Sequence, residues 1–449
     1  MKKELTLPVP VKEAIERLDR KGYETWLVGG VRDLLLGKTP HDWDLTTSAT
    51  PDQIERAFEG FTLNLAGKRF GTVSVRDRGL WMDITTFRKE GSYADHRHPD
   101  SIVFTPYLFE DLKRRDFTVN AIVYHPQKGL RDYFCGERDL KKKWIRAIGD
   151  ADKRFSEDAI RILRALRFCA TLGFEAEEKT KASLHRCKEL LLTMAPERIL
   201  PEFCRMLCGK NIRAVLTEYA DVIGVIVPEI LPAIGFSQHS PFHCFDVWQH
   251  TVHAVSFADP DPDVRLATFF HDLSKPQCLS IDETGRGHFY GHPKKSAVLA
   301  REIMQRMKFP TKQIERVLLL ITYHDSHPAG RYDVKRLLCD VRPENITALT
   351  LVMEADARAH SRWAIARRIQ QIHILKNTAQ DIVQSGECFD LSTLAVRGED
   401  MIALGFTGTD IGLALQFALE KVMRGEWQNT KDGILPHMEE NRAQIVKNH

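Results

Sequence analysis

Apolar residues follow different periods in the two halves of the chain. Residues 11–20 place apolar side chains three and four positions apart, which predicts an amphipathic helix. Residues 23–28 form a mostly apolar run that ends in Gly29-Gly30, which predicts a buried strand followed by a turn. Residues 71–77 and 80–88 alternate apolar and polar side chains around a short turn, so we expect two paired strands there.

Helical spacing dominates from about residue 155 to the end, with interruptions at proline and glycine. The clearest helical segments are residues 195–203, 269–275, 295–309 and 366–376, and the polar stretch 281–292 predicts a loop between them. The pattern therefore predicts an α+β protein in which a small mixed head is followed by a long helical region.

The composition narrows the expected number of domains and the expected location of the protein, but it does not indicate a function. A chain of 449 residues is expected to form two to four domains, and a formal net charge of +3 neither requires nor excludes nucleic acid. The nine cysteines include no C-x-x-C pair, which is typical of reduced thiols in a cytoplasmic protein. The sequence has no secretory signal pattern and no apolar run long enough for a bilayer, so we expect a cytoplasmic location without a membrane contact.

The densest candidate chemistry lies in residues 27–45, LVGGVRDLLLGKTPHDWDL. Gly29 and Gly30 allow backbone N–H groups to approach an anion, and Arg32 is a donor for phosphate oxygens. Asp42 and Asp44 alternate on an extended segment and so face one side, where they can hold Mg²⁺. Taken alone, a Gly-Gly pair is usually a turn and an Asp-x-Asp pair is usually solvated. The combination within one short segment favours a catalytic site.

Five segments in order resemble the class II tRNA nucleotidyltransferase and bacterial poly(A) polymerase superfamily, whose head is similar to the palm of DNA polymerase beta. The resemblance covers residues 24–205, through LVGGVRDLLLGKTPHDWDL, LKRRDFTVNAI, RDYFCGERDL, EDAIRILRALRF and PERILPEF. It implies a nucleotidyltransferase head in which two Mg²⁺ ions act on a nucleoside triphosphate and an RNA 3′-hydroxyl.

Roles for individual residues follow from the same resemblance. Asp83 is our candidate for a third catalytic carboxylate, although a solvated strand aspartate is nearly as natural. The remaining implied roles are metal ligation by Asp42 and Asp44, triphosphate contacts by Gly29, Gly30 and Arg32, a phosphate or ribose contact by Arg115, and ribose 2′-OH recognition by Asp116 with Asn120.

The segment EDAIRILRALRF predicts one helix with a polar face formed by Glu157, Asp158, Arg161 and Arg164. Such a face is usually a set of surface ion pairs. In this family it implies base recognition, because a carboxylate and a guanidinium match the amine and ring nitrogen that cytosine and adenine both present. Guanine and uracil would leave these groups unpaired, at about 1–3 kcal/mol each.

Two segments distinguish among the relatives. Residues 65–75 resemble the strand of CCA-adding members, and residues 87–99 resemble the full-length flexible loop that accompanies addition of the final A. Both favour addition of C, C and A to tRNA from CTP and ATP. Addition of A alone, addition of CC alone and polyadenylation remain the alternatives.

Several helical segments further along resemble the HD superfamily of metal phosphohydrolases, with the adjacent His-Asp pair as the specific part. Ser274 stands where a glycine is common. This resemblance implies a second divalent-metal site, for example for Mn²⁺ or Ni²⁺, although the segment can equally serve as a scaffold for RNA. The implied ligands are His250, His271, Asp272, His292, His324 and Asp356.

The expected domains are a head at residues 1–147, a helical neck at 148–235, an HD-like body at 236–360 and a helical tail at 361–449. The tail is expected either to grip the tRNA elbow or to act as a helical cap. The expected partners are CTP, ATP and the acceptor stem and elbow of tRNA, and the oligomeric state stays open. The rival functions are an HD phosphohydrolase with a nucleotide-binding head and a non-catalytic RNA-binding protein, and the intact Asp42 and Asp44 argue against the second.

Overall fold

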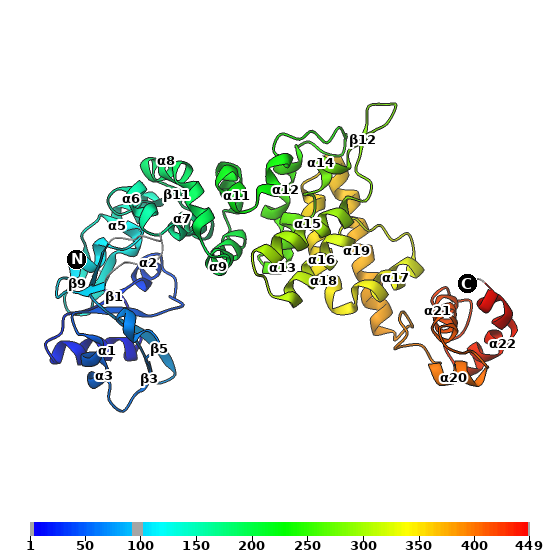
Figure 1. Ribbon diagram of the computed structural model, residues 1–449, viewed down its shortest axis with the longest axis horizontal. Helices are drawn as coiled ribbons and strands as arrows, with labels where there is room; N and C mark the ends of the chain where they lie inside the picture. The colour runs from blue at the N-terminus through cyan, green and yellow to red at the C-terminus, as the bar shows by residue number, and fades with distance from the viewer. Residues whose placement is uncertain (1–3, 92–101, 448–449) are drawn as a thin grey trace. The chain divides into compact units, whose positions relative to one another are not determined.

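The computed structural model describes residues 4–91 and 102–447 of the chain, so part of the loop expected at residues 87–99 lies outside it. The fold has two compact units, Met1–Pro228 and Glu229–His449, each of which is described separately (Figure 1). As predicted, the mixed sheet lies in the N-terminal part of the chain and helices dominate the described residues after it, although the helices of residues 151–226 belong to the first unit.

The first unit is built on a seven-stranded sheet with the strand order β3-β4-β5-β2-β1-β8-β9. Within it, β2 and β5 are parallel, and the other paired strands are antiparallel. The strands are β1 (Thr25–Val28), β2 (Asp44–Thr47), β3 (Thr62–Asn64), β4 (Thr72–Asp77), β5 (Leu80–Thr86), β8 (Ile122–His125) and β9 (Gly129–Asp132). Two small sheets pair β6 (Arg88–Glu90) with β7 (Ile102–Phe104), and β10 (Trp144–Ile145) with β11 (Glu175–Ala176).

The hairpin predicted at residues 71–88 is confirmed. Asp77 pairs with Leu80, so the loop between β4 and β5 has only two residues, Arg78 with φ 47° and Gly79 with φ 83°. Positive φ at both positions matches a type I′ turn, whose twist suits paired strands.

Helices cover the sheet and continue into the second part of the unit. The predicted helix at residues 11–20 is confirmed as α1, which contacts β1, and α3 contacts β4 and β5 (Figure 1). The helices are α1 (Val9–Arg20), α2 (Gly30–Leu35), α3 (Pro51–Ala57), α4 (Leu108–Lys113), α5 (Gly136–Lys142), α6 (Ala151–Glu157), α7 (Ile160–Leu172), α8 (Glu178–Arg186), α9 (Pro196–Leu207), α10 (Ile212–Glu218) and α11 (Ala220–Ile226). Short 3₁₀ helices are η1 (Lys68–Phe70), η2 (Thr118–Asn120) and η3 (Lys188–Thr193), and η4 (Pro228–Ala233) lies at the boundary with the second unit.

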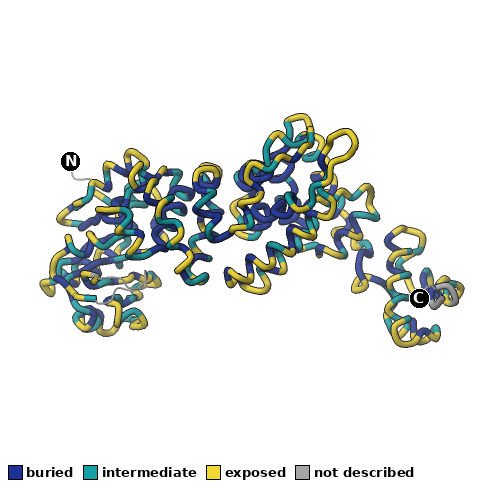
Figure 2. Tube along the Cα trace, turned by 45° about the horizontal axis from the view of Figure 1, so that its top comes forward, coloured by how far each residue is buried: buried dark blue, intermediate teal, exposed yellow. Residues whose placement is uncertain are grey.

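The second unit packs its helices around a buried interior (Figure 2). In its first part, α12 and α13 contact each other and α18, and α15 contacts α16. The helices are α12 (Val247–Phe257), α13 (Pro262–Phe270), α14 (Lys275–Cys278), α15 (His292–Arg306), α16 (Thr311–Tyr323), α17 (Arg331–Val341), α18 (Pro343–Arg358), α19 (Arg362–Gln384), α20 (Gly398–Ala403), α21 (Asp410–Met423) and α22 (Lys431–Lys447). The last three surround a separate apolar core that includes Met401, Phe406 and Met438.

Two local expectations were wrong. The segment 269–275 is not one helix, because α13 ends at Phe270 and His271 is its C-terminal cap residue. The stretch 281–292 is not wholly a loop, because β12 (Ser280–Ile281) pairs with β13 (Gly287–His288) and α15 begins at His292. Across the described residues, no helix combines the length and the apolar character that a bilayer crossing needs.

Candidate functional site

Three of the predicted head carboxylates meet at one end of the sheet. Asp44 begins β2, where it pairs with Val28 of β1 on one side and with Asp83 of β5 on the other. The parallel pairing of β2 with β5 thus places Asp83 beside Asp44. Asp42 lies two residues before Asp44, and both Asp42 and Asp83 are exposed.

Gly29 makes room for Asp44. Gly29 has φ +66°, and a Cβ atom built there would lie 2.8 Å from Asp44 Oδ2. A side chain at position 29 would therefore be strained and would also push the carboxylate aside.

Burial and two neighbouring carboxylates raise the pKa of Asp44 to about 6, against the opposing effect of Arg115, and the neighbours are Asp83 and Asp42. A divalent cation among these oxygens would remove that repulsion, and carboxylate oxygens are the ligands that Mg²⁺ prefers. The donor set therefore fits Mg²⁺.

A cavity of about 790 Å³ opens beside Asp42 and Asp44. Asp83, Asp158 and Arg161 are not part of its lining. The predicted residues that line it are Gly29, Gly30, Arg32, Asp42, Asp44, Arg115, Asp116, Asn120 and Arg164.

A chain of hydrogen-bonded side chains lines the same cavity as the carboxylates. Arg32 Nη1 donates to Asn120 Oδ1 at 2.7 Å, and Asn120 Nδ2 donates to Asp116 Oδ1 at 3.0 Å. Arg164 donates to Asp116 Oδ2 from Nε at 2.8 Å and from Nη2 at 2.6 Å. Arg32 also donates to both carboxylate oxygens of Asp33.

Asp116 is held ionised within this chain. Burial by itself would raise its pKa, but Arg164 and Asn120 lower the pKa of Asp116 far below its ordinary value. The carboxylate therefore stays an acceptor across the physiological pH range, which suits recognition of a hydroxyl group.

The structure corrects the helix expected at residues 157–168. Helix α6 ends at Glu157, Asp158 is extended with φ −146° and ψ 104°, and α7 begins at Ile160. Asp158 and Arg161 therefore do not share one continuous helix face. The side chain of Asp158 can instead bond the backbone at the break, since the N–H of Ile160 donates to Asp158 Oδ1 at 3.4 Å.

Both residues have other partners. Asp158 Oδ2 accepts from Arg198 Nη2 of α9 at 2.9 Å. Arg161 donates to Glu157 Oε2 at 2.9 Å and to the carbonyl oxygens of Arg154 and Arg114. We did not single out Arg198 from the sequence, although it lies within the PERILPEF segment.

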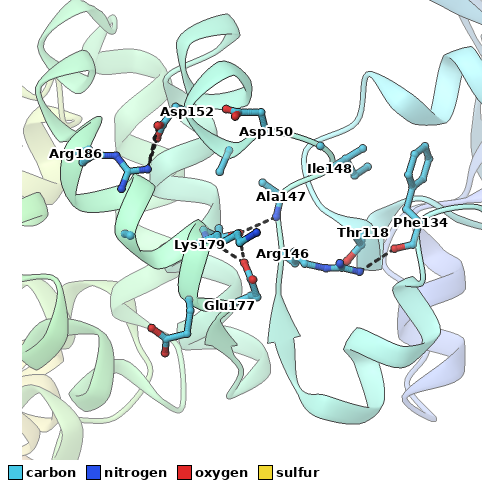
Figure 3. Close-up of a pocket in the computed structure, with 15 residues that line it drawn as sticks. Thr118, Phe134, Arg146, Ala147, Ile148, Asp150, Asp152, Glu177, Lys179 and Arg186 are labelled. Carbon is cyan, nitrogen blue, oxygen red and sulfur yellow. Dashed lines mark hydrogen bonds and ion pairs between the residues drawn. The ribbon is translucent and has the colours of Figure 1, made fainter.

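A separate cavity of about 810 Å³ shares no lining residue with the first (Figure 3). Two of its arginines are already engaged, since Arg186 Nη2 contacts Asp152 Oδ1 at 2.9 Å and Arg146 Nη2 donates to the carbonyl of Phe134 at 3.0 Å. None of the predicted site residues lines it.

In the second unit, the six residues of the HD-like pattern come together from separate segments. His250 Nε2 lies 2.8 Å from Asp356 Oδ1, and His271 Nε2 lies 3.1 Å from Asp272 Oδ2. His292 Nε2 is 3.3 Å and His324 Nε2 is 4.0 Å from Asp272 Oδ1. All six side chains are buried.

The polar atoms of this cluster are short of hydrogen bonds. Among the described residues, His271 Nε2 and both carboxylate oxygens of Asp272 are buried and make no well-aligned hydrogen bond, and their close neighbours are ion-pair partners such as Lys275 Nζ, which lies 2.7 Å from Asp272 Oδ2. Two ligand sets have donor atoms within 4.8 Å of one another, one of His250, His271, Asp272 and Asp356, the other of Asp272, His292 and His324. Buried imidazoles and carboxylates this close to one another fit a divalent metal ion.

Charged groups lie close together in this cluster. Burial would lower the pKa of His271, but Asp272 and Asp356 raise it to about 10. A cavity of about 400 Å³ reaches the cluster past Lys275 and Arg368. Sequence reasoning missed His243 and His360, whose ring nitrogens approach that of His250, because only their spacing in the fold distinguishes them from surface histidines.

Two family models match the first unit. The Poly A polymerase head domain matches residues 25–146, and the family described as a probable RNA and SrmB-binding site of polymerase A matches residues 173–230.

Relatives of known identity are CCA-adding enzymes. The chain is 47% identical over 209 residues to the CCA-adding enzyme of Leuconostoc citreum, which covers 46% of this chain and 51% of that protein. It is 40% identical over 274 residues to the CCA-adding enzyme of Lactobacillus helveticus, which covers 59% of this chain and 67% of that protein. The chain thus spans about half the length of several curated relatives that it matches.

The whole fold has a counterpart among solved structures. The CCA-adding enzyme of Bacillus stearothermophilus, in a complex with CTP, superposes with a TM-score of 0.75 at 25% identity, which covers 99% of this chain and 100% of that one.

Proposed function

Since this chain belongs to the family of CCA-adding enzymes, we propose that it adds C, C and A to the 3′ end of tRNA without a nucleic-acid template, using CTP and ATP and releasing pyrophosphate. The observation that carries the proposal is the meeting of Asp44 and Asp83 in parallel register beside Gly29, with Asp42 adjacent. Nine free cysteines and a tRNA substrate also favour the cytoplasm as the location.

Asp42 and Asp44, with Asp83 as the third carboxylate, would hold two Mg²⁺ ions. Mg²⁺ at such a site supplies activation of a 3′-hydroxyl and charge neutralisation on the triphosphate. The backbone at Gly29 and Gly30 and the guanidinium groups of Arg32 and Arg115 would lie near the triphosphate on the cavity wall.

Sugar and base recognition would involve separate residues. Asp116, fixed by Arg164 and Asn120, would accept a hydrogen bond from the ribose 2′-OH. Asp158 and Arg161 would select cytosine or adenine by their pairing edges, with Arg198 orienting Asp158. Neither residue lines the cavity, so this selection would require a rearrangement at the α6–α7 junction, where Asp158 sits at a helix break.

The RNA strand would be held through its phosphates. Lys38 and Arg205 line the cavity, and neither has an ion-pair partner within the described ranges 4–91 and 102–447. The other arginines of the wall are each paired with a carboxylate, and they are Arg32, Arg115, Arg164 and Arg167. Free cations suit a phosphate backbone, and we propose that the acceptor stem lies against them while the helical tail grips the elbow.

The deciding experiment incubates the purified chain with Mg²⁺, tRNA that lacks its 3′ end and each labelled nucleoside triphosphate in turn. We expect two cytidylate additions followed by one adenylate addition, and none from GTP or UTP. Adenylate alone would indicate an A-adding enzyme, a stop after two cytidylates a CC-adding enzyme, and long adenylate runs a poly(A) polymerase. No incorporation from any triphosphate would reject the proposal.

The buried cluster of the second unit supports a second function. We propose that His250, His271, Asp272, His292, His324 and Asp356 hold a divalent metal such as Mn²⁺ or Ni²⁺ and that the site hydrolyses phosphate esters. The close approach of these buried donor atoms carries this proposal, because imidazoles and carboxylates gathered away from water are the ligands that such metals prefer.

Its test measures hydrolysis of p-nitrophenyl phosphate and 2′,3′-cyclic nucleotides with Mn²⁺, Ni²⁺ or Mg²⁺. We expect activity in the wild-type chain and none in a His271→Ala, Asp272→Ala variant that still adds nucleotides to tRNA. Absence of hydrolysis with all three metals would leave this part of the fold as a scaffold.

A further inference from the structure

Three guanidinium groups lie around the ring of Phe168. Its side chain on α7 is buried, with 4% of its surface exposed. The Cζ atoms of Arg167, Arg32 and Arg164 lie 4.0, 4.8 and 5.6 Å from the ring centroid. All three distances are within the range of cation–π attraction, and burial strengthens that attraction.

Two of these arginines connect the ring to Asp116 and Asn120. Arg32 bonds Asn120, Asn120 bonds Asp116, and Asp116 bonds Arg164, so the contacts form a closed circuit that begins and ends at Phe168. Phe117, which follows Asp116, also packs edge-on against Phe168, with centroids 5.9 Å apart. The ring is the one member of this circuit without a polar atom.

Like charges would otherwise separate the arginines. Three guanidinium groups around one ring repel one another, and each carboxylate fixes only one or two of them. A ring with a negative face attracts Arg32 and Arg164 together, which keeps the two ends of the Asn120–Asp116 hydrogen bond at a fixed separation.

We propose that Phe168 is a positioning residue for sugar recognition, and that its π electrons hold Arg32 and Arg164 so that Asp116 and Asn120 distinguish a ribose from a deoxyribose. This inference rests on the proposed nucleotide-adding function. Phe168 also lines the cavity beside the head carboxylates. In the proposed role it acts through the two arginines, whereas a direct contact with the base would change the binding of CTP and dCTP alike.

The test replaces Phe168 in the full chain with phenylalanines that carry one, two or three ring fluorines. Fluorine withdraws electron density from the ring face and changes its size little, so a role in packing alone would not respond to the series. For each protein, kcat and KM are measured with CTP and with dCTP on trimmed tRNA, and binding of both to the protein alone is measured by equilibrium dialysis.

We expect the preference for CTP over dCTP to fall stepwise with each fluorine, by about tenfold in total, while kcat with CTP changes less than threefold. Phe168→Leu, which keeps an apolar side chain without a ring, should match the trifluorinated protein. The same series at Phe155, which is fully buried on α6, should leave the preference unchanged.

A preference that stays flat across the series would overturn the inference, even if Phe168→Leu were impaired, because it would assign Phe168 to packing only. Failure of the proposed function would look different, since the wild-type chain would then not extend trimmed tRNA at all. The dialysis measurement still decides the role of Phe168 in that case, because it requires only nucleotide binding.

Discussion

The head carboxylates and the buried histidine cluster are both suited to divalent cations, yet they are built in opposite ways. In the head, Asp42 and Asp83 are exposed and Asp44 is half-buried beside an open cavity. In the second unit, all six candidate ligands are buried, and four of them are imidazoles.

The contrast indicates two kinds of metal use. Exposed carboxylates bind weakly enough for Mg²⁺ to arrive and leave with a triphosphate, whereas buried imidazoles favour a resident transition metal that exchanges slowly. Under the proposed functions, the head would bind cations that arrive with the substrate, and the cluster would retain its metal between reactions.

The largest expected effect is on the head. An Asp42→Ala, Asp44→Ala double variant should add nucleotides to trimmed tRNA at least about 1,000-fold more slowly, because both metal ligands are lost. Single-turnover incorporation of labelled CTP measures it. An Asp77→Ala variant, changed at the turn of the neighbouring hairpin, should remain active. Undiminished nucleotide addition by the double variant would contradict the assignment of Asp42 and Asp44 as metal ligands.

The second prediction concerns resident metal. After dialysis against a chelator at 4 °C, the wild-type chain should retain a transition metal measurable by plasma mass spectrometry, whereas a His271→Ala, Asp272→Ala variant should retain almost none. Head activity should return at once when Mg²⁺ is added back. A His185→Ala, Asp221→Ala variant removes an ion pair of the first unit and serves as the control. Equal metal content in all three proteins would contradict the proposal that the buried histidine cluster retains a metal.

A smaller effect tests the hydrogen-bonded chain around Asp116. Arg164→Met should destabilise the fold by about 1–3 kcal/mol at pH 7.5, since it strands the buried carboxylate of Asp116, and the 34% exposure of the Arg164 side chain limits the loss. Chemical denaturation measures it. An Arg186→Met variant, which breaks the exposed pair with Asp152, should differ from wild type by less than about 0.5 kcal/mol.

The sign of the pH dependence follows from the pKa of Asp116. In the wild type, Arg164 holds that pKa below its ordinary value of 3.8, so the pair stabilises the fold at neutral pH and loses this effect as the pH falls below about 4. Without Arg164, burial raises the pKa of Asp116. The difference between variant and wild type should therefore shrink from pH 7.5 to pH 5, and an increase would contradict the assignment.

The smallest effect concerns RNA. Arg205→Ala should raise the KM for trimmed tRNA by about threefold and lower the slope of log affinity against log salt by about one, while the KM for CTP stays constant. Arg213→Ala, which removes an exposed arginine of α10 that lines none of the cavities described above, is the matched control. Equal salt slopes for the two variants would place the RNA elsewhere.

Local patterns predicted much of the fold but not the contacts that complete the sites. Helix α1, strand β1 and the β4–β5 hairpin follow from short-range periodicity, and the structure confirms them. The proximity of Asp83 to Asp44 depends on a parallel pairing between strands distant in sequence, which no local pattern encodes.

Helical spacing misled us at Asp158, because the apolar period continues through the break where the side chain bonds the backbone instead. We did not single out Phe168 from the sequence, because its contacts with Arg32 and Arg164 arise only in the folded chain. The six HD-like residues were found by resemblance and the structure brings them together, whereas their metal binding stays a prediction.

The two-residue turn at Arg78 and Gly79 limits which insertions the β4–β5 hairpin can accept. Asp83 follows the turn by a few residues, and successive side chains of β5 point to opposite faces. Insertion of a single residue between Gly79 and Asp83 would rotate the carboxylate to the far side of the sheet unless the extra residue were absorbed in a bulge. In relatives of this protein, we therefore expect insertions in the hairpin to lie in its loop or to add an even number of residues. An insertion of an odd number of residues within β5 should accompany loss of the proposed nucleotide addition.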